Sequence, residues 1–435
     1  MEPLHAGFTP GHQGKFMRIG LWLMLTVAFV LRLSAFREVS RAPEGFMVGD
    51  GFFYHVLAKN ILQGRYQITP ENTPDEEYGE YEGHLTKGYI FHIVSLDQPT
   101  NYWSPGYPAM LAIVYAVFGV RPWIASLLGC LLGTSCCFLL WKIASRIAGP
   151  RCALIVASLW AVHPVAVRSS ARLETETPAL TLLLLLVFLS LLWRRPDGSL
   201  SLGRSLAMGI LGGLLFLVRS TMALWIVALA VSLLLERTKH SMITAVALLA
   251  AFTATIVPWG FRNQASLGKF MLLETRSAQV FYGELSGQMR VPRRFAEMKG
   301  VTESQRWQEM KQMSWELIRS QPRLIWRPAW HNAKTGLFPL GNHWHAVFYL
   351  GDVIMILSVL AGINLLRTSW RKFLPMLLFL FLYFVFVLLL LKGYESRFRM
   401  MSDWIGLIFA AAFLYQLFDS ILKRMNFRPL GPTGR

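Results

Sequence analysis

Long apolar segments separated by short basic connections run through almost the whole chain. About 20 apolar residues in an α-helix cross the hydrocarbon core of a bilayer, and in lipid only a helix or a closed barrel satisfies every backbone hydrogen bond. These segments therefore predict an all-α integral membrane protein with about ten transmembrane helices. The expected spans are 16–36, 123–147, 150–167, 176–193, 203–218, 222–236, 240–257, 346–366, 372–391 and 401–422.

Composition and charge agree with this prediction. The chain is 54% hydrophobic and 16% charged, whereas soluble domains carry about 25% charged residues. The net charge of +18 does not indicate a nucleic-acid partner, because the Lys and Arg residues lie between apolar spans, where they set topology and contact membrane lipids. The four cysteines lie in apolar segments and form no metal-site pattern, and the absence of a glycine-rich phosphate loop argues against nucleotide-driven transport. The residues therefore indicate no metal site, and no cofactor is expected.

The apolar segment 106–119 is too short for an ordinary span. If it does not cross the membrane, the basic clusters between the other spans fall on the side of the N-terminus, as cytoplasmic connections should. We therefore expect a half-membrane helix there, with both chain ends in the cytoplasm. The expected divisions are a cytoplasmic N-terminus 1–15, a transmembrane module 16–257 that includes the first outer loop 37–122, a second outer loop 258–345, C-terminal helices 346–422 and a basic cytoplasmic tail 423–435.

Asp50 lies between two glycines just beyond the first span. From Phe52 onward apolar residues recur at helical spacing until Gly64, with His55 on the polar side, which predicts a helix lying in the membrane interface. Asp50 has two interpretations: it caps this helix, or it is a general base at the membrane surface. A capping-box pattern at Thr302–Gln305 predicts a second, amphipathic helix in the other outer loop.

Glu174 and Glu176 lie at the outer end of the span 176–193. An acid so close to hydrocarbon is costly and is usually functional or paired. The alternative is a helix N-terminus that favours acids ahead of Pro178. Glu176 is the better candidate of the two because it lies deeper.

Basic residues are usually enriched in the cytoplasmic loops of membrane proteins. Arginines expected on the outer face are therefore candidates for a functional role. Their planar guanidinium groups suit phosphate, although simple snorkelling to the interface would also explain them. The candidates are Arg219 between two short spans, Arg262 beside Asn263 after Pro258, and Arg397 and Arg399 before the last span.

Taken in order, these motifs resemble the polyprenyl-phosphate-sugar transferases of the GT-C fold. The nearest branch is the protein O-mannosyltransferase and aminoarabinose-transferase-like group, which is glycosyltransferase family 39-like. The resemblance covers residues 16–410. It rests on Gly49-Asp50 with Tyr54 and Gly64, Ser104-Pro105-Gly106-Tyr107-Pro108, Glu176-Thr177-Pro178, Pro258-Trp259 with Arg262-Asn263, and Arg397-Phe398-Arg399.

The resemblance implies a GT-C-like helical bundle with two long non-cytoplasmic loops that bear interfacial helices. It implies that Asp50 is the catalytic base or orients the acceptor, that Glu176, or else Glu174, assists, and that basic residues near the late loops hold the lipid phosphate. His55 and Tyr107 belong to the same motifs and are expected to bind substrate. The family often has an Asp-Glu pair where this chain has Asp50-Gly51, so the acceptor stays open.

The predicted function is inverting transfer of a sugar from a polyprenyl-phosphate donor to a hydroxyl of a glycan, lipid or protein acceptor. The reaction is expected on the non-cytoplasmic face of a bacterial inner membrane. Asp50 acts as base, and Arg262, Arg397 and Arg399 stabilise the leaving phosphate. The alternative is a transporter or flippase of a lipid-linked sugar, which would use the same arginines without a base; no repeat between the two halves supports it.

Overall fold

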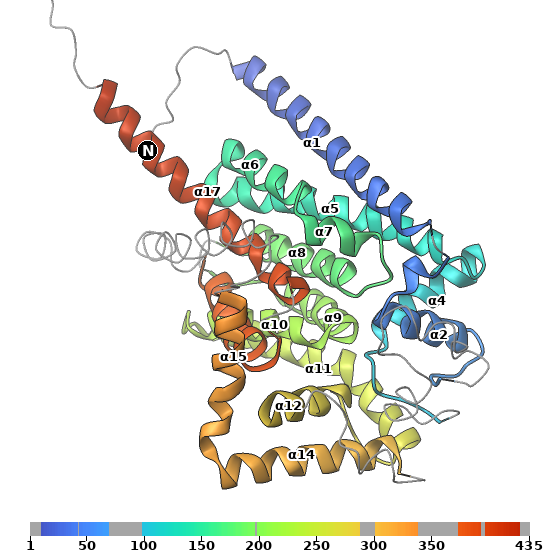
Figure 1. Cartoon of the computed structure of the whole chain (residues 1–435). Coiled ribbons are helices and arrows are strands. Elements are labelled where there is room, and N and C mark those ends of the chain that lie inside the picture. Colours follow the sequence, from blue (N-terminus) through green and yellow to red (C-terminus); the bar gives the residue numbers. More distant parts are fainter. Residues whose placement is uncertain are drawn as a thin grey trace, which may run out of the picture.

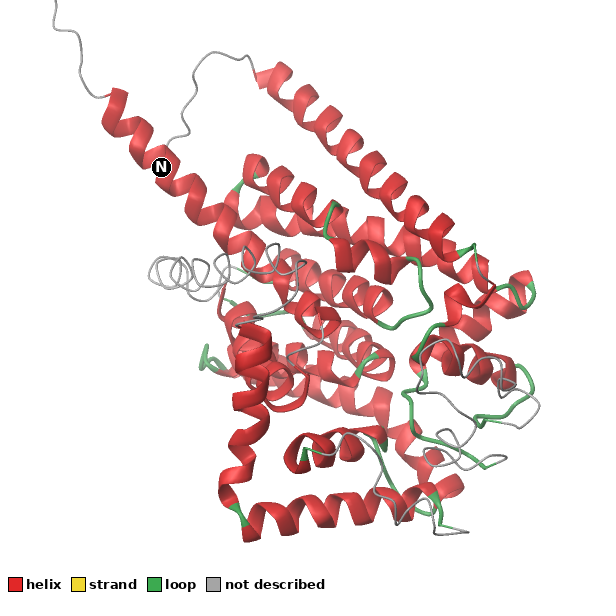
Figure 2. Ribbon diagram, viewed as in Figure 1, coloured by secondary structure: helices red, strands yellow, loops and turns green. Residues whose placement is uncertain are grey.

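The computed structural model describes residues 10–41, 43–68, 98–195, 198–287, 301–337, 373–392 and 396–426. These residues form a bundle of helices (Figures 1 and 2), and no strand occurs among them. In the same ranges, β-type pairing is limited to an isolated bridge between Gln67 and Pro99. The predicted all-α class is confirmed.

Among the described residues, five helices are long and apolar enough to cross a membrane, or six if a bent pair counts as one span. They are α1 (Pro10–Val39), α5 (Pro122–Ala148), α8 (Glu176–Trp193), α11 (Lys239–Leu267) and α17 (Ser396–Asn426), and the bent pair is α6 (Pro150–Ala161) with α7 (Pro164–Ser170). Shorter apolar helices are α4 (Gly106–Phe118), α9 (Leu202–Val218), α10 (Leu224–Leu234) and Phe373–Val387. The chain is an integral membrane protein. The expected span 346–366 lies outside the described residues, so the number of about ten spans stays a prediction.

Proline marks the start of several helices. Pro122, Pro150 and Pro164 each occupy the first turn of a helix, where a missing N–H costs no hydrogen bond. Between α6 and α7 the helix axis bends by 62°, and Nδ1 of His163 accepts a hydrogen bond from the Ala166 N–H to begin α7. The bend brings the turn that follows α7 towards the first outer loop, where the Leu173 N–H donates to the Phe46 carbonyl at 3.0 Å.

The helices are stacked in sequence order over much of the bundle (Figure 1). α1 packs on α5 and α6, α5 on α8, α8 on α9, and α9 on α11. The close contact between α9 and α11 depends on small residues: a Cβ at Gly209 would lie 2.3 Å from the Leu248 carbonyl oxygen. Large buried residues such as Trp160, Trp225 and Trp404 fill the core.

Four further described helices lie in the two segments predicted as outer loops, namely α2 (Asp50–Ile61), α12 (Arg276–Ser286), α14 (Glu303–Ser320) and α15 (Trp326–Leu337). α2 packs on α4, and α12 packs on α14. The predicted capping box at the start of α14 is confirmed: the Thr302 side chain accepts from the Gln305 N–H, and the Gln305 side chain accepts from the Thr302 N–H.

A buried acid joins the two outer loops. Glu303 accepts hydrogen bonds from the Thr100 hydroxyl at 2.6 Å, the Asn101 N–H at 2.8 Å and the Thr275 hydroxyl at 2.7 Å. Burial raises the pKa of Glu303, and these three donors oppose that effect. The contacts fix the segments that carry Trp103 and Arg276.

We expect Glu303→Gln to lower the free energy of unfolding by about 1–3 kcal/mol, because an NH₂ group would then face a donor that the carboxylate had satisfied. Thermal unfolding followed by tryptophan fluorescence measures the change. The control is Glu316→Gln, which alters an exposed acid on the same helix. Equal unfolding midpoints for the two variants would show that the loops do not depend on this contact.

Candidate active site

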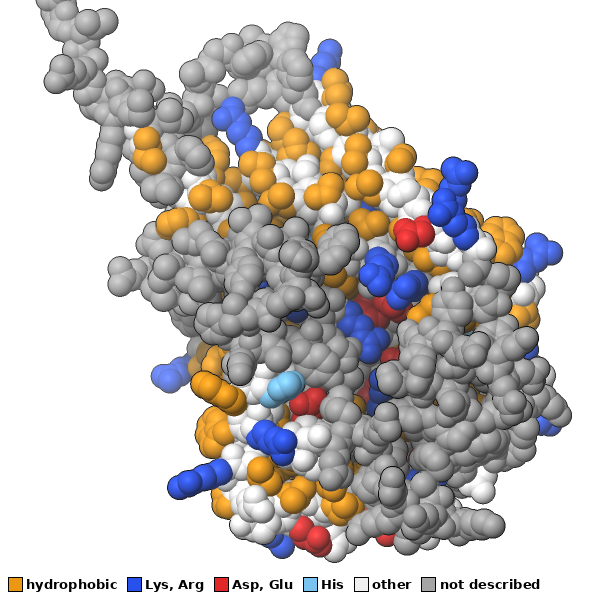
Figure 3. Space-filling view, in the orientation of Figure 1, with side chains coloured by type: hydrophobic (Ala, Val, Ile, Leu, Met, Phe, Trp, Pro, Cys, Tyr) orange, Lys and Arg blue, Asp and Glu red, His pale blue; other side chains and the backbone are white. Residues whose placement is uncertain are grey.

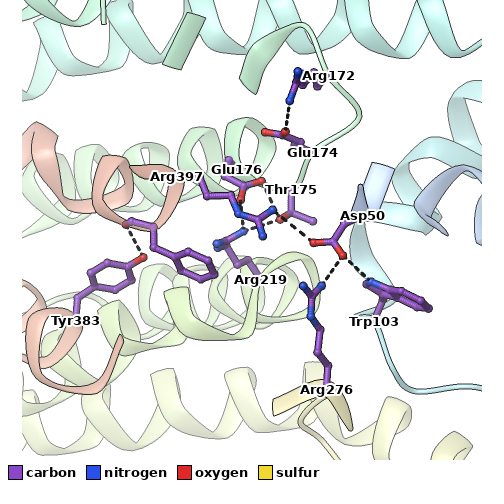
Figure 4. Close-up of polar contacts among 11 residues, drawn as sticks. Asp50, Trp103, Arg172, Glu174, Thr175, Glu176, Arg219, Arg276, Tyr383 and Arg397 are labelled. Carbon is purple, nitrogen blue, oxygen red and sulfur yellow. Dashed lines mark hydrogen bonds and ion pairs between the residues drawn. The ribbon is translucent and has the colours of Figure 1, made fainter. Parts of the chain in front are cut away.

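Two acids at the N-termini of different helices face one another. Asp50 is the first residue of α2 and Glu176 is the first residue of α8. The two turns touch: a Cβ at residue 51 would lie 2.9 Å from the Leu173 carbonyl oxygen, so Gly51 permits this approach. Gly49, with φ of 60°, precedes α2, and the Asp50 carboxylate points away from its own helix into the space before α8 (Figure 4).

Three guanidinium groups surround these acids (Figure 4). Nη1 of Arg276 lies 2.5 Å from one Asp50 oxygen. Arg397 reaches both acids, with Nη1 3.5 Å from the other Asp50 oxygen and Nε 3.8 Å from Glu176. Nη1 of Arg219 donates to Glu176 at 2.9 Å. Basic and acidic side chains also gather near the middle of the face seen in Figure 3.

Asp50 is held in its charged form. Burial by itself would raise the pKa of this carboxyl, but the nearby charges of Arg276 and Arg397 outweigh burial and bring the pKa well below its usual range. The Trp103 indole N–H also donates to Asp50 at 3.3 Å. While both arginines contact it, the carboxylate is a weak proton acceptor.

Glu176 is only 1% exposed, and it shares Arg219 with the neighbouring Thr175 hydroxyl, which accepts from the same nitrogen at 2.8 Å. The guanidinium of Arg219 lies over the Phe398 ring at 4.6 Å. The Tyr383 hydroxyl donates to the Phe398 carbonyl at 2.9 Å. Nε of Arg219 is buried and has no hydrogen-bond partner among the described residues, so one donor of this group stays available.

The sequence of residues 97–260 matches the family of dolichyl-phosphate-mannose-protein mannosyltransferases. Among solved structures, the oligosaccharyltransferase of Archaeoglobus fulgidus in its apo form matches with a TM-score of 0.56 and 13% identity, over 94% of this chain and 51% of that one. The oligosaccharyltransferase AglB of the same organism, in complex with an inhibitory peptide and a dolichol-phosphate, matches with a TM-score of 0.53 and 14% identity, over 97% and 53%. The chain has the fold of a GT-C glycosyltransferase.

The predicted GT-C fold and the resemblance to mannosyltransferase-like proteins are thus confirmed. The chain spans about half the length of the oligosaccharyltransferases that it matches. ArnT from Cupriavidus metallidurans in the apo state is 12% identical over 96% of this chain and 82% of its own, but a TM-score of 0.39 is too low for a comparison of folds. No match was found among curated proteins.

The GT-C fold places some of the predicted residues away from this cluster. Arg262 donates to the carbonyls of Thr100 at 2.8 Å and Tyr66 at 3.1 Å. Both carbonyls lie within the predicted first outer loop, and the Tyr66 carbonyl also accepts from the Thr100 N–H at 3.1 Å. Arg262 therefore holds two parts of this loop together instead of lying beside Asp50. Asn263 is buried and donates to the Met271 carbonyl at 2.8 Å.

Three further predicted residues contact other groups. Nε of Arg399 lies 3.7 Å from Asp403. His55 shares a hydrogen bond of 2.8 Å with the Tyr115 hydroxyl, and burial lowers the pKa of His55 to about 4. Tyr107 is buried, and its ring lies 5.2 Å from the ring of Tyr54. Tyr54 follows Asp50 by one turn of α2. None of these contacts joins the arginine cluster.

Other residues of the cluster were not among the predicted ones. They are Arg276 and Trp103, which contact Asp50 directly. Arg276 is one of several arginines in the second predicted outer loop, so its residue type alone does not distinguish it. Within the described part of the chain, no group of three or more His, Cys, Asp or Glu side chains is arranged to hold a metal ion.

Glu174 lies on the same turn as Glu176 but faces away from Asp50 (Figure 4). Burial, together with the charge of Glu176, raises the pKa of Glu174 to about 7. Nη1 of Arg172 lies 3.8 Å from Glu174, and the charges of Arg397 and Arg172 both oppose the rise in its pKa.

This raised pKa makes stability depend on pH. Between about 4.5 and 7 the folded protein binds more protons at Glu174 than the unfolded chain does, so stability falls as pH rises through this range. We expect Glu174→Gln to flatten the slope of stability against pH by up to about 1.4 kcal/mol per pH unit. Unfolding measured at several pH values tests this. An unchanged slope in the variant would mean that Glu174 titrates at an ordinary pKa.

Proposed function

We propose that the protein transfers a sugar from a polyprenyl-phosphate donor to an acceptor hydroxyl on the non-cytoplasmic face of the membrane. The observation that carries the proposal is the chain of ion pairs from Arg276 through Asp50, Arg397 and Glu176 to Arg219. The mannosyltransferase family match supports it. So does the structural likeness to an oligosaccharyltransferase that was solved with a dolichol-phosphate.

The arginines suit the leaving group of such a reaction. A departing phosphate carries negative charge, and preorganised guanidinium groups stabilise it without reorganisation. Arg219 has a buried Nε without a partner in the described residues, and Arg397 lies 3.5 Å from Asp50 and 3.8 Å from Glu176. A phosphate placed beside them would meet the Nε–H of Arg219 and the positive charge of Arg397.

The donor also changes the chemistry of Asp50. When a phosphate draws Arg276 and Arg397 towards itself, the charges that lower the pKa of Asp50 become less effective, and burial makes the carboxylate more basic. The acceptor oxygen then bonds to the anomeric carbon from the side opposite the phosphate. The bond from that carbon to the phosphate oxygen breaks, and the acceptor proton passes to Asp50. The anomeric configuration inverts.

Glu176 supports the same step without touching the acceptor. Its contacts with Arg219 and Arg397 hold both guanidinium groups beside Asp50. Polyprenyl phosphate is already a good leaving group, so protonation by a second acid is not required; this differs from glycoside hydrolysis.

The test uses the purified protein in proteoliposomes with a panel of radiolabelled polyprenyl-phosphate sugars. We expect one donor to release free polyprenyl phosphate together with a labelled product whose anomeric configuration is inverted. Movement of the intact donor between leaflets without release would instead indicate a flippase. A product that keeps the anomeric configuration of the donor would exclude direct, one-step displacement of the phosphate by the acceptor.

A further inference from the structure

A separate cavity lies between α4, α5 and the start of α8. It measures about 420 Å³, which is within the range of about 300–1,000 Å³ that is usual for small-molecule sites. Its walls are apolar over most of their area. The residues that form the walls include Met110, Leu111, Val114, Leu128, Leu131 and Leu132.

One end of this cavity is polar. Arg172 and Glu174 line it there, and Figure 4 shows both residues apart from the cluster around Asp50 and Glu176. Nε of Arg172 is buried and makes no hydrogen bond to any described residue. Its Nη1 lies 3.8 Å from Glu174, which is too long for a hydrogen bond. A buried guanidinium donor without a partner is costly and favours an anionic or hydroxyl-rich ligand.

The cavity also reaches the lipid-facing surface. Leu131 on its wall is 52% exposed, and Ile113 and Val117 on the neighbouring face of α4 are 66% and 68% exposed. Exposed apolar residues on membrane helices face lipid. An amphiphile can therefore enter sideways from the bilayer, with its chain in the apolar part and its head at the polar end.

We propose that this cavity binds the hydrocarbon chain of a lipid acceptor, whose polar headgroup lies at Arg172 and Glu174. The inference rests on the proposed transferase activity. A transferase needs two substrates, and the donor phosphate is assigned to Arg219, Arg276 and Arg397. A peptide acceptor would need partners for its backbone groups, and an apolar wall offers none.

The neighbouring turn connects the two sites. Thr177 and Pro178 line the cavity, and Glu176 directly before them contacts Arg219 and Arg397. A headgroup held at Arg172 and Glu174 would therefore lie two residues before Glu176 in sequence, where the charge of Arg397 also acts. Burial and the charge of Glu176 raise the pKa of Glu174 to about 7, so near neutral pH its carboxyl can donate a hydrogen bond as well as accept one.

The test uses a diazirine-bearing lysophosphatidate, which has one chain and an anionic head, with the full-length protein in nanodiscs. We expect photolabelling within residues 106–135. Val114→Trp fills the cavity and should reduce labelling at least tenfold, and Arg172→Gln should reduce it at least threefold. The control Val246→Trp adds the same bulk to an exposed apolar groove on α11 and should leave labelling unchanged.

Several results would overturn the assignment. Labelling that excess polyprenyl phosphate displaces would give the cavity to the donor chain. Labelling that is absent, or unaffected by both Val114→Trp and Arg172→Gln, would mean that no specific lipid binds there. Transfer to a serine peptide that Val114→Trp leaves unchanged would indicate a protein acceptor. Because labelling needs no turnover, it can succeed or fail independently of donor cleavage, so the two proposals are tested separately.

Discussion

Asp50→Asn should reduce the turnover number by at least a factor of 100, which corresponds to about 2.7 kcal/mol in the activation barrier. The amide cannot take the proton of the acceptor hydroxyl, although it keeps the shape of the side chain and can still accept from the Trp103 indole. The KM for the donor should not rise, since the loss affects the chemical step and not phosphate binding.

The measurement is initial-rate release of polyprenyl phosphate from the active donor, with wild type and variant in the same vesicles. Glu316→Gln is a matched control because it changes an exposed acid far from the cluster in the same chemical way. Turnover by Asp50→Asn within threefold of wild type would remove Asp50 from the reaction and leave it as a residue that only holds Arg276 in place.

The second large effect concerns stability. Glu176 and Arg219 form an ion pair of 2.9 Å, with their side chains 2% and 11% exposed. Removal of one partner leaves the other charge buried, which usually costs about 3–5 kcal/mol. We therefore expect Glu176→Leu or Arg219→Leu alone to lower the free energy of unfolding by that amount.

The double variant should lose less than either single variant, because no buried charge is left unpaired and apolar side chains replace the pair. The measurement is a double-mutant cycle, in which wild type, the two single variants and the double variant are unfolded by denaturant in the same detergent. Losses that simply add in the double variant would mean that the two groups do not interact. Arg397 also lies 3.8 Å from Glu176, so the measured coupling includes its response.

The fold and several residues of the charged cluster could be predicted, because charged residues at the edge of an apolar segment stand out in the sequence of a membrane protein. Asp50, Glu176, Arg219 and Arg397 are charged residues at the ends of apolar segments, where charge is costly without a partner. Their pattern was informative before any contact was known. The capping box at Thr302 could be predicted on separate grounds, from the spacing of Thr302 and Gln305.

Other parts could not be predicted, for reasons that lie in tertiary structure. Arg276 belongs to a long polar loop where arginine is common, and only the docking of α12 brings it to Asp50. The motif around Arg262 predicts a phosphate ligand, but its contacts are the carbonyls of Tyr66 and Thr100, which are far from it in sequence. No local sequence pattern shows which distant carbonyls a guanidinium group will reach in the folded chain.

The contacts of Asp50 in the folded protein decide between interpretations that its residue type alone leaves open. The sequence left two interpretations open, a helix cap or a base. In the structure Gly49 occupies the cap position without a side-chain hydrogen bond, and the Asp50 carboxylate contacts Arg276, Arg397 and Trp103. Its chemical role stays a proposal, and its basicity depends on whether a donor phosphate draws the arginines away.

The proposed mechanism requires that the donor phosphate takes the arginines from Asp50. The most direct test is the affinity of the protein for polyprenyl phosphate, measured for wild type, Asp50→Asn and Arg276→Gln. If the phosphate takes the arginines from Asp50, Arg276→Gln should bind at least tenfold more weakly, about 1.4 kcal/mol. Asp50→Asn should bind more tightly than wild type, because the competing carboxylate is gone. Weaker binding by Asp50→Asn, or equal binding by all three proteins, would contradict the account.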